Sequence, residues 1–566
     1  MPDGIFDYTV PEPRCELPEI HPDISTQLRS LHPIFVNTDQ LNKFQHDACI
    51  EAQTYDRLIR VLETRLLEAK VMRSNLQEKS AQVSSLLSPV RRLPTEIIRE
   101  IFILAVGDAK DNMFGSCSKW ESRTLDISAV CHRWRIIALD TPELWDRFSV
   151  DLNTRAQAPL ELFLSRSRES PLSITITQTD DDIVDFTLAT QLIAHASRWS
   201  SLDHHYLDER IRHIITEEVS DLPILQYVTC CAQGRSFPVE LSEQLRRCSL
   251  LNTLVVRYGD SSQILVPSLP SDHIMNLKIQ CRHSGALKAS LEMLRSYADN
   301  VKTITYSSTP TKEDYSHVSS AQHVSFAEPV KPFACRDVWR FRVNLYNRDG
   351  IYRHLMDIFQ SLELPSLRAL SLIGDCETNG TFEGEWPAYS FNQFVGRSKC
   401  TLTKFVLDGI PISDTELIAA LRHFPSLVDL MIIELFMNED NLQPDKLVQT
   451  VTKLLVGTMV TTTLAAHGQP GDCTPAPFLP KLEILTLFVH AHFDADVEFV
   501  KMVQSRWYTA RSSDLEEPSH LKQCRIRSVT LGVQGREVQE AIYEPLKVCD
   551  AEGMRVVVKA NGNYIV

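Results

Sequence analysis

One short apolar pattern, repeated along the second half of the chain, restricts the fold more than any other feature of the sequence. It spans nine residues and places apolar side chains at the first, fourth, seventh and ninth positions, best seen at Leu364, Leu367, Leu370 and Leu372. Copies recur from about residue 196, at intervals of about 23 to 37 residues with longer gaps after residues 424 and 479. Further copies begin at Leu222, Cys248, Ala298, Cys335, Phe424 and Leu479, and partial copies lie at Ile274–Ile279, Leu402–Leu407 and Ile526–Leu531.

The end of each copy alternates apolar and other residues, which predicts a strand with one buried face. Helical stretches such as residues 413–421 lie between the copies. A unit of one strand and one helix exposes apolar residues that only its neighbours can cover, so the units are expected to stack. The alternative is a generic domain with Leu-rich strands. Both interpretations place the chain in the α/β class.

A second segment, residues 93–145, predicts three short helices. The first begins after Leu93-Pro94 and carries apolar residues at helical spacing: Ile97, Ile98, Ile101, Phe102 and Ala105. The second has Asp126 as a suitable N-cap and repeats that spacing: Ile127, Val130, Cys131, Trp134 and Ala138. Thr141 and Pro142 suit the cap and first turn of a third helix, which carries Leu144 and Trp145.

Three short helices in about 50 residues bury little apolar surface, and units of that size often need a partner. They are therefore expected either to pack as a subdomain on their own chain or to offer an apolar face to another protein. The pattern alone does not choose between these two alternatives.

Residues 41–87 contain neither Pro nor Gly and predict one long helix, along which a heptad can be laid. Its a positions are Leu41, Ala48, Tyr55, Leu62, Ala69, Leu76 and Val83. Its d positions are Phe44, Glu51, Leu58, Arg65, Met72, Lys79 and Leu86, so every second d residue is charged. This seam is weak for a symmetric coiled coil. The helix either pairs with another copy or stays single and sets the position of the module that follows it.

Composition argues against several classes of protein. The net charge is −15 and no strongly basic region is present, so nucleic acid is not an expected ligand. The start of the chain has no secretory signal, and no apolar run of about 20 residues predicts a membrane span. The 14 cysteines are scattered, and several sit at apolar positions of the pattern. They are expected to be reduced thiols of a protein of the cytoplasm, the nucleus or both.

The sequence contains no phosphate-binding loop, dinucleotide fingerprint, nucleophile elbow or zinc helix. Residues 375–380 imitate the start of a calcium loop, but Trp386 stands where that loop needs Glu. The group of His204, His205, His213 and Asp208 is better explained as polar surface. We expect no catalytic residue, no metal and no cofactor.

The series LPTEIIREIF, ISAVCHRWRIIA and PELW resembles an F-box. In that family the Leu-Pro helix and the Val-Cys-x-x-Trp helix bind the Skp adaptor, and through it a cullin. The resemblance implies an adaptor-binding set of Leu93, Pro94, Glu96, Ile97, Ile98, Ile101, Phe102, Val130, Cys131 and Trp134. The polar residues 107–123 make the spacing longer than the family usually has. Docking is expected to survive if this insert loops out, and to be disturbed if it reshapes the helix pair.

The repeated unit resembles a leucine-rich repeat, and the chain as a whole resembles the fungal-type F-box-like domain proteins with an irregular leucine-rich-repeat C-terminal region. That repeat family often places Asn or Cys three residues after the strand. This chain has other residues there, so an irregular array is expected: Asp375, Leu435, His490, Gln233, Gly259 and Ile410.

The predicted organisation has four parts: an extended or disordered N-terminus (1–38), a long helix or weak coiled coil (39–88), a small three-helix F-box-like module (89–147) and a leucine-rich-repeat-like solenoid (148–566). The resemblance implies a non-catalytic substrate receptor of an SCF-type ubiquitin ligase, which binds an unknown target protein through the repeats. The other hypothesis is a non-catalytic repeat scaffold, in which the helical module only caps the solenoid.

Overall fold

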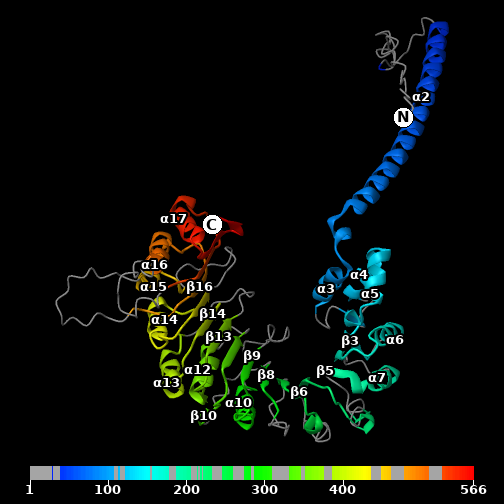
Figure 1. Ribbon diagram of the computed structural model, residues 1–566. Coiled ribbons are helices and arrows are strands. Elements are labelled where there is room, and N and C mark those ends of the chain that lie inside the picture. The colour runs from blue at the N-terminus through cyan, green and yellow to red at the C-terminus, as the bar shows by residue number, and fades with distance from the viewer. Residues whose placement is uncertain are drawn as a thin grey trace. The chain divides into compact units, whose positions relative to one another are not determined.

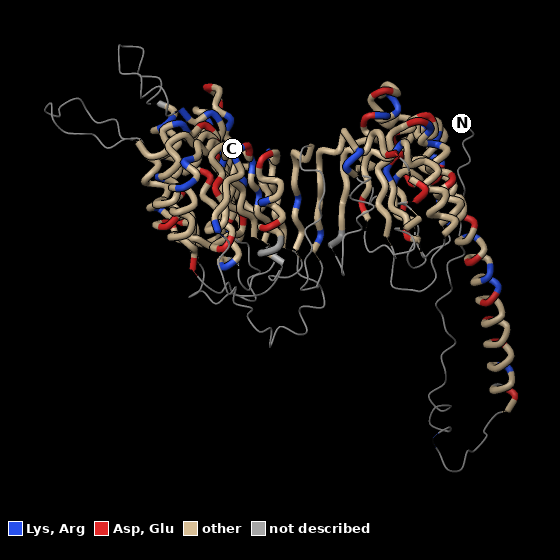
Figure 2. The backbone as a smooth tube through the Cα atoms, turned by 90° about the horizontal axis from the view of Figure 1, so that it is seen from below, with Lys and Arg blue, Asp and Glu red and all other residues tan. Residues whose placement is uncertain are grey.

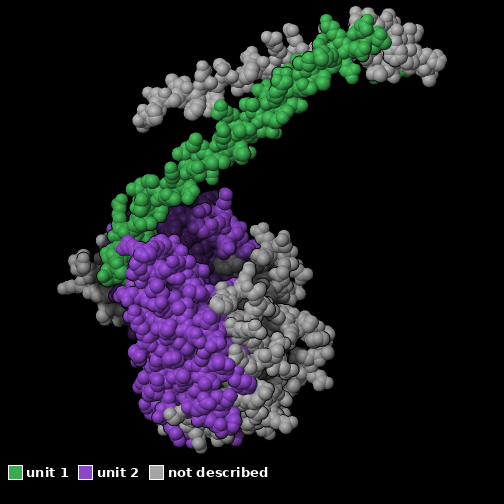
Figure 3. Space-filling model, turned by 90° about the vertical axis from the view of Figure 1, so that its right-hand side faces the viewer, with its two compact units in different colours: residues 1–98 green, residues 99–566 purple. Residues whose placement is uncertain are grey.

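The computed structural model divides the chain into two compact units, residues 1–98 and residues 99–566 (Figure 3). The described residues are 29, 38–107, 112–114, 121–152, 156–177, 186–204, 213–214, 217–219, 221–232, 245–258, 273–281, 286–308, 331–345, 351–374, 385–434, 448–460, 477–508 and 525–566. The N-terminus predicted to be extended therefore lies almost wholly outside the described residues.

One helix dominates the first unit. Helix α2 (Thr38–Leu87) is 50 residues long, which confirms the long helix expected from the run without Pro or Gly. Basic and acidic residues are mixed along its length (Figure 2). It ends just before the short 3-10 helix η1 (Pro89–Arg92), and helix α3 (Thr95–Val106) then crosses from the first unit into the second.

The second unit is built on a mostly parallel sheet of 17 strands. Hydrogen-bonded neighbours follow the order β2, β1, β3 to β9, β11 and β13 to β19, so strands adjacent in space are nearly always adjacent in the chain (Figure 1). Among these pairings only β1 with β2 and β18 with β19 are antiparallel. Two further short strands, β10 (Phe333–Ala334) and β12 (Leu362–Glu363), pair separately.

The strands of the large sheet are β1 (Asn112–Phe114), β2 (Glu121–Ser122), β3 (Arg147–Asp151), β4 (Leu172–Thr177), β5 (Trp199–His204), β6 (Tyr227–Ala232), β7 (Thr253–Tyr258), β8 (Asn276–Cys281), β9 (Thr303–Ser308), β11 (Arg340–Leu345), β13 (Ala369–Gly374), β14 (Lys404–Asp408), β15 (Asp429–Ile433), β16 (Ile484–Val489), β17 (Ser528–Val533), β18 (Arg555–Ala560) and β19 (Asn563–Tyr564). The other helices are α4 (Arg123–Val130), α5 (His132–Leu139), η3 (Pro142–Leu144), α6 (Gln157–Arg166), α7 (Phe186–Ile193), η4 (Ala196–Arg198), α10 (Ala286–Ser296), α12 (Ile351–Ser361), α13 (Ala388–Ser398), α14 (Asp414–Leu421), α15 (Lys453–Thr458), α16 (Asp496–Tyr508) and α17 (Glu540–Ala551).

Two rows of buried apolar side chains run across this sheet, and they are the last two apolar positions of the nine-residue pattern. The first row pairs, strand by strand, Val228, Leu254, Leu277, Ile304, Phe341, Leu370, Phe405, Leu430, Leu485 and Val529. The second pairs Cys230, Val256, Ile279, Tyr306, Val343, Leu372, Leu407, Ile432, Leu487 and Leu531. Each strand therefore places its apolar pair beside those of its neighbours, which is how units too small to have their own core bury apolar surface.

The rows extend beyond the copies of the pattern found in the sequence. At the N-terminal end Phe148 pairs with Ile174, and Ile174 pairs with Leu202. At the C-terminal end Val529 pairs with Val556 on β18. All of these side chains are buried, so the strands near residues 150 and 175 belong to the same array as the later ones.

Helices α10 and α12 to α17 lie along one face of the sheet, and successive members contact each other (Figure 1). The apolar rows of the strands are buried on this side. Helix α14 shows why the helices begin where they do. Ser413 is its N-cap: the Ser413 Oγ accepts the Glu416 N–H at 3.3 Å, while the Glu416 carboxylate accepts the Ser413 N–H at 3.2 Å. This capping box satisfies two helix-end groups at once.

The predicted second helix of the 93–145 segment is wrong in its bounds and its continuity. It begins at Arg123, because Ser122 and not Asp126 is its N-cap; the Ser122 Oγ accepts the Leu125 N–H at 3.2 Å. It also breaks at Cys131, whose backbone is extended, and α5 restarts at His132. The third predicted helix is present as η3, with Leu144 and the following Trp145 buried.

Candidate docking surface

Helix α3 is apolar on two faces rather than one. Ile98, Phe102 and Val106 are four residues apart, lie on one face and are buried, with Phe102 only 2% exposed. Ile97, Ile101 and Leu104 follow a second line at helical spacing and are exposed, with Leu104 80% exposed. Eight of the ten residues from Ile97 to Val106 are aliphatic or aromatic, namely Ile97, Ile98, Ile101, Phe102, Ile103, Leu104, Ala105 and Val106. No single packed face of a helix can cover such a run.

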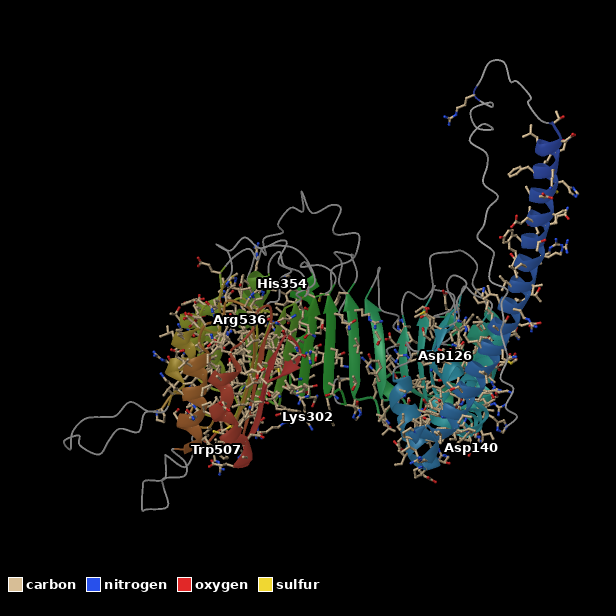
Figure 4. All side chains as sticks on the ribbon, turned by 90° about the horizontal axis from the view of Figure 1, so that it is seen from above. Asp126, Asp140, Lys302, His354, Trp507 and Arg536 are labelled. Carbon is tan, nitrogen blue, oxygen red and sulfur yellow. The ribbon has the colours of Figure 1, made fainter. Side chains whose placement is uncertain are left out.

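Within the second unit, α3 is held against α4 and α5 by contacts near both of its ends. The Phe102 and Trp134 rings lie 4.8 Å apart between centroids. An Arg123 guanidinium N–H donates to the Ala105 carbonyl at 3.2 Å. Arg99 lies 3.9 Å from a carboxylate oxygen of Asp140, the residue that follows α5 (Figure 4). These contacts join α3, α4 and α5 into one packed group, which we call the helix group. Phe102 is buried inside it.

The ten residues expected to bind an adaptor fall into three exposure groups. Five are exposed: Pro94, Glu96, Ile97, Ile101 and Val130. Three are half-buried: Leu93, Cys131 and Trp134. Two are buried: Ile98 and Phe102. Side chains as buried as these two cannot touch another protein, so only part of the expected set lies at a surface.

Four exposed apolar side chains of the second unit, which we call the exposed apolar set, come from these three helices. They are Ile101 and Leu104 on α3, Val130 at the end of α4 and Ile136 on α5. Val130 is 61% exposed, and Ile101 is 46% exposed. Leu104 and Ile136 were not predicted as binding residues. The available signal for Leu104 was the excess of apolar residues on α3.

The insert at residues 107–123 is partly built into the sheet. Its β1 pairs in parallel with β3 and antiparallel with β2. Asn112 is buried between them: its side-chain amide donates to the Arg147 carbonyl at 3.1 Å, and its Oδ1 accepts from the Ser122 hydroxyl at 2.8 Å and the Thr124 N–H at 3.3 Å. These bonds position the start of α4. The described part of the insert therefore does more than loop out.

An aromatic cluster joins the insert and the helices to the first strands. The Phe114 ring lies 4.7 Å from the Phe163 ring, and the Trp145 ring lies 4.9 Å from it on another side. Phe148 on β3 completes the cluster, and all four rings are buried. The Trp145 indole N–H donates to the Ala138 carbonyl at 2.8 Å, so the end of α5 is bonded to the same cluster. The end of the helix group is therefore packed against the first strands of the large sheet.

A second candidate surface lies on the sheet face opposite the buried rows, because side chains alternate between the two faces of a strand. One row of paired residues there changes character along the sheet, and we call it the open-face row: Arg257, Gln280, Ser307, Asn344, Ile373, Asp408, Ile433 and Phe488. At its polar end Arg257 binds both carboxylate oxygens of Asp203, at 2.7 and 3.0 Å, and donates to Gln280 at 2.8 Å. At its other end Ile373, Ile433 and Phe488 are half-buried apolar side chains.

Two buried thiols of the described residues are poor nucleophiles. Burial raises the pKa of Cys335 to about 12 and that of Cys248 to about 11, so both thiols stay protonated at neutral pH. No cluster of three or more His, Cys, Asp or Glu side chains able to hold a metal occurs in the described part of the chain. Residues 375–380, His205 and Asp208 lie outside it. None of the described helices is long and apolar enough to cross a bilayer.

Comparison with known proteins gives no family for this chain. A scan against protein-family models found no match, and a search of curated proteins found none either.

Proposed function

We propose that this protein is a substrate-recognition subunit of an SCF-type ubiquitin ligase. The helix group α3–α5 binds a Skp-type adaptor, and the sheet unit, an irregular leucine-rich-repeat solenoid, binds the target protein. The observation that carries the proposal is the division of α3 into a buried face and an exposed apolar face, together with the exposed Val130 and Ile136 on the two helices that pack against it. Aliphatic side chains at that exposure are most stable when a partner covers them.

The contact surface in this proposal differs from the one expected from the sequence. Ile101, Leu104, Val130 and Ile136 make contact with the adaptor, while Phe102 and the half-buried Trp134 keep the helices packed. Covering each large apolar side chain contributes about 1.5–3 kcal/mol when it is fully exposed beforehand. The four side chains are between 46% and 80% exposed, so covering the set contributes about 4–7 kcal/mol. Association costs about 4–15 kcal/mol, so polar contacts around the set supply the rest of the binding free energy.

The target-binding surface in this proposal is formed by the two ends of the open-face row, because Ser307 and Asn344 in its middle are buried, each 8% exposed. Its Arg257–Asp203 pair has a fixed geometry, since both guanidinium nitrogens bond to the carboxylate, and it offers a rigid polar contact. The apolar end near Phe488 offers a packing contact for the target. Function then requires no reacting group in this chain. Holding the target near the ligase raises its effective concentration at a remote site of ubiquitin transfer.

The proposal is tested by titrating the full-length protein with a purified Skp-type adaptor. The wild type should bind saturably. Leu104→Glu combined with Val130→Glu should weaken binding by about a hundredfold or more, because two apolar contacts are lost and two charges lose water. A matched control is Leu454→Glu with Val548→Glu, two exposed apolar side chains on α15 and α17. The control should bind as the wild type does; absence of wild-type binding, or equal loss in both variants, contradicts the proposal.

A second candidate function is the repeat scaffold in which the helix group protects the end of the array. Phe114 supports it, because this ring contacts Phe148 on β3 and Phe163 on α6. Under the scaffold hypothesis, deletion of residues 89–139 exposes these rings and makes the remainder aggregate, while adaptor never binds. Adaptor binding by the intact protein decides between the two functions.

A further inference from the structure

Helix α2 leaves an apolar stripe exposed along its second half. Twelve of its large apolar residues are exposed, and nine of them lie at heptad positions a, d, e or g: Ile59, Val61, Leu62, Leu66, Met72, Leu76, Val83, Leu86 and Leu87. The a and d side chains from Leu41 to Leu58 are half-buried, whereas every side chain from Val61 to Leu87 is exposed. Heptad spacing of this kind is the pattern that a second helix covers by knobs-into-holes packing.

We propose that the stripe pairs two copies of this chain as an antiparallel coiled coil over the length of α2. The occupant of the stripe is thus α2 of a second copy. The dimer is independent of adaptor binding, because it uses residues of the first unit only.

The charged d positions set the orientation. In a parallel, in-register pair each d residue faces its own copy, so three layers would bring two like charges together in an apolar seam: Glu51, Arg65 and Lys79. Each of those layers is destabilised by repulsion and by loss of water. Shifting a parallel pair by one heptad avoids the like charges, but it breaks twofold symmetry and leaves ends that recruit further copies.

Reversing one helix removes this conflict. In an antiparallel pair the d residues of one helix face the a residues of the other. All seven a positions are uncharged, from Leu41 to Val83, so no register places two charged seam residues in one layer. The long aliphatic stems of Arg65 and Lys79 can lie over the seam while their charged ends reach water.

The size of the pairing also fits. A helix of 50 residues is about 75 Å long and about 10 Å wide, so full overlap hides about 1,500 Å² in total, within the range of stable dimers. Overlap of the second half alone hides about half of that area, which is below the range. Full-length overlap is therefore the arrangement that forms a stable dimer. It places the two copies of Leu87 at opposite ends of the rod.

The oligomeric state of the full-length protein is the first test. Light scattering after size-exclusion chromatography should give about 129 kDa, twice the 64.4 kDa of one chain. Leu76→Glu with Val83→Glu, both at a positions that face Glu51 and Phe44 of the other copy, should raise the dimer dissociation constant at least about a hundredfold. The matched control places the same change at the outer positions f and c, Leu67→Glu with Val71→Glu, and should raise it less than about threefold. A monomeric wild type, or a seam variant no weaker than the control, overturns the proposal.

Orientation is tested without relying on any destabilised variant. A photo-crosslinking amino acid at position 86 is incorporated into an equal mixture of isotope-labelled and unlabelled chains, so that links between copies are identified by mass. Antiparallel pairing links position 86 to residues 38–62 of the other copy. A helix cannot make the contact from 86 to 41 within one chain, because the two positions are about 68 Å apart along its axis. Links between copies that fall on residues 63–87 overturn the antiparallel arrangement.

Discussion

Two neighbouring residues of α3 should have opposite roles, and Phe102→Ala compared with Ile101→Ala tests this directly. Phe102 is buried against Trp134, at 4.8 Å between ring centroids, so its truncation leaves a cavity inside the helix group. Truncations of this kind cost about 3–5 kcal/mol. Ile101 is 46% exposed, and its truncation removes a side chain that packs on one side only, which costs about 1 kcal/mol or less.

Hydrogen exchange measured by mass spectrometry is the appropriate assay, because a chain of this size with two units does not unfold in one step. Peptides that cover α3 and α5 report the local opening of the helix group. Phe102→Ala should speed their exchange about a hundredfold to a few thousandfold, at tenfold per 1.4 kcal/mol. Ile101→Ala should change it less than about tenfold. Unchanged exchange in the Phe102 variant would refute the assignment of this side chain to the packed face.

Three further predictions concern the sheet unit. Burial raises the pKa of Asp146 to about 7, partly offset by Arg147, so the folded state keeps a proton that the unfolded state releases near pH 4. The wild type should therefore lose thermal stability relative to Asp146→Asn as pH rises from about 4 to about 7, with no further relative loss above that; a difference in melting temperature that stays constant with pH contradicts this. Gly532→Ala places a Cβ against the Phe488 ring and should cost about 1–3 kcal/mol, seen as faster exchange in β16 and β17 peptides; wild-type exchange would show that the ring yields freely. Arg506→Met leaves the three backbone carbonyls bonded by this buried guanidinium without that donor and should destabilise α16 by about 3–5 kcal/mol, and unaltered exchange in α16 would contradict it.

The repeated strands could be predicted from the sequence because the information is local and redundant. The pattern marks each buried strand pair independently, and many weak copies in one register outweigh the irregularity of any one of them. Leu370 and Leu372, for instance, pair with Phe405 and Leu407 at the same two positions. The strands around Phe148 and Ile174 carry no full copy of the nine-residue pattern, although the predicted solenoid (148–566) includes them.

The helix group near residue 100 was predicted less well, for two physical reasons. Helical spacing identifies apolar faces but does not say which one is covered when a helix has two. Ile97 and Ile98 look alike in the sequence, yet the first is exposed and the second is 1% exposed. The break at Cys131 has no local signal either, since neither Pro nor Gly marks it. Asp126 has a suitable cap side chain, but tertiary bonds through Asn112 and Ser122 start the helix four residues earlier.

Protection from hydrogen exchange on adding a purified Skp-type adaptor to the full-length protein measures the proposed docking most directly. Protection should appear in peptides of α3, α4 and α5, which contain Ile101, Leu104, Val130 and Ile136, while peptides of the open-face row on β7 to β16 stay unchanged. Protection confined to the sheet, or no protection at a saturating concentration of adaptor, would contradict the proposal that these helices bind the adaptor.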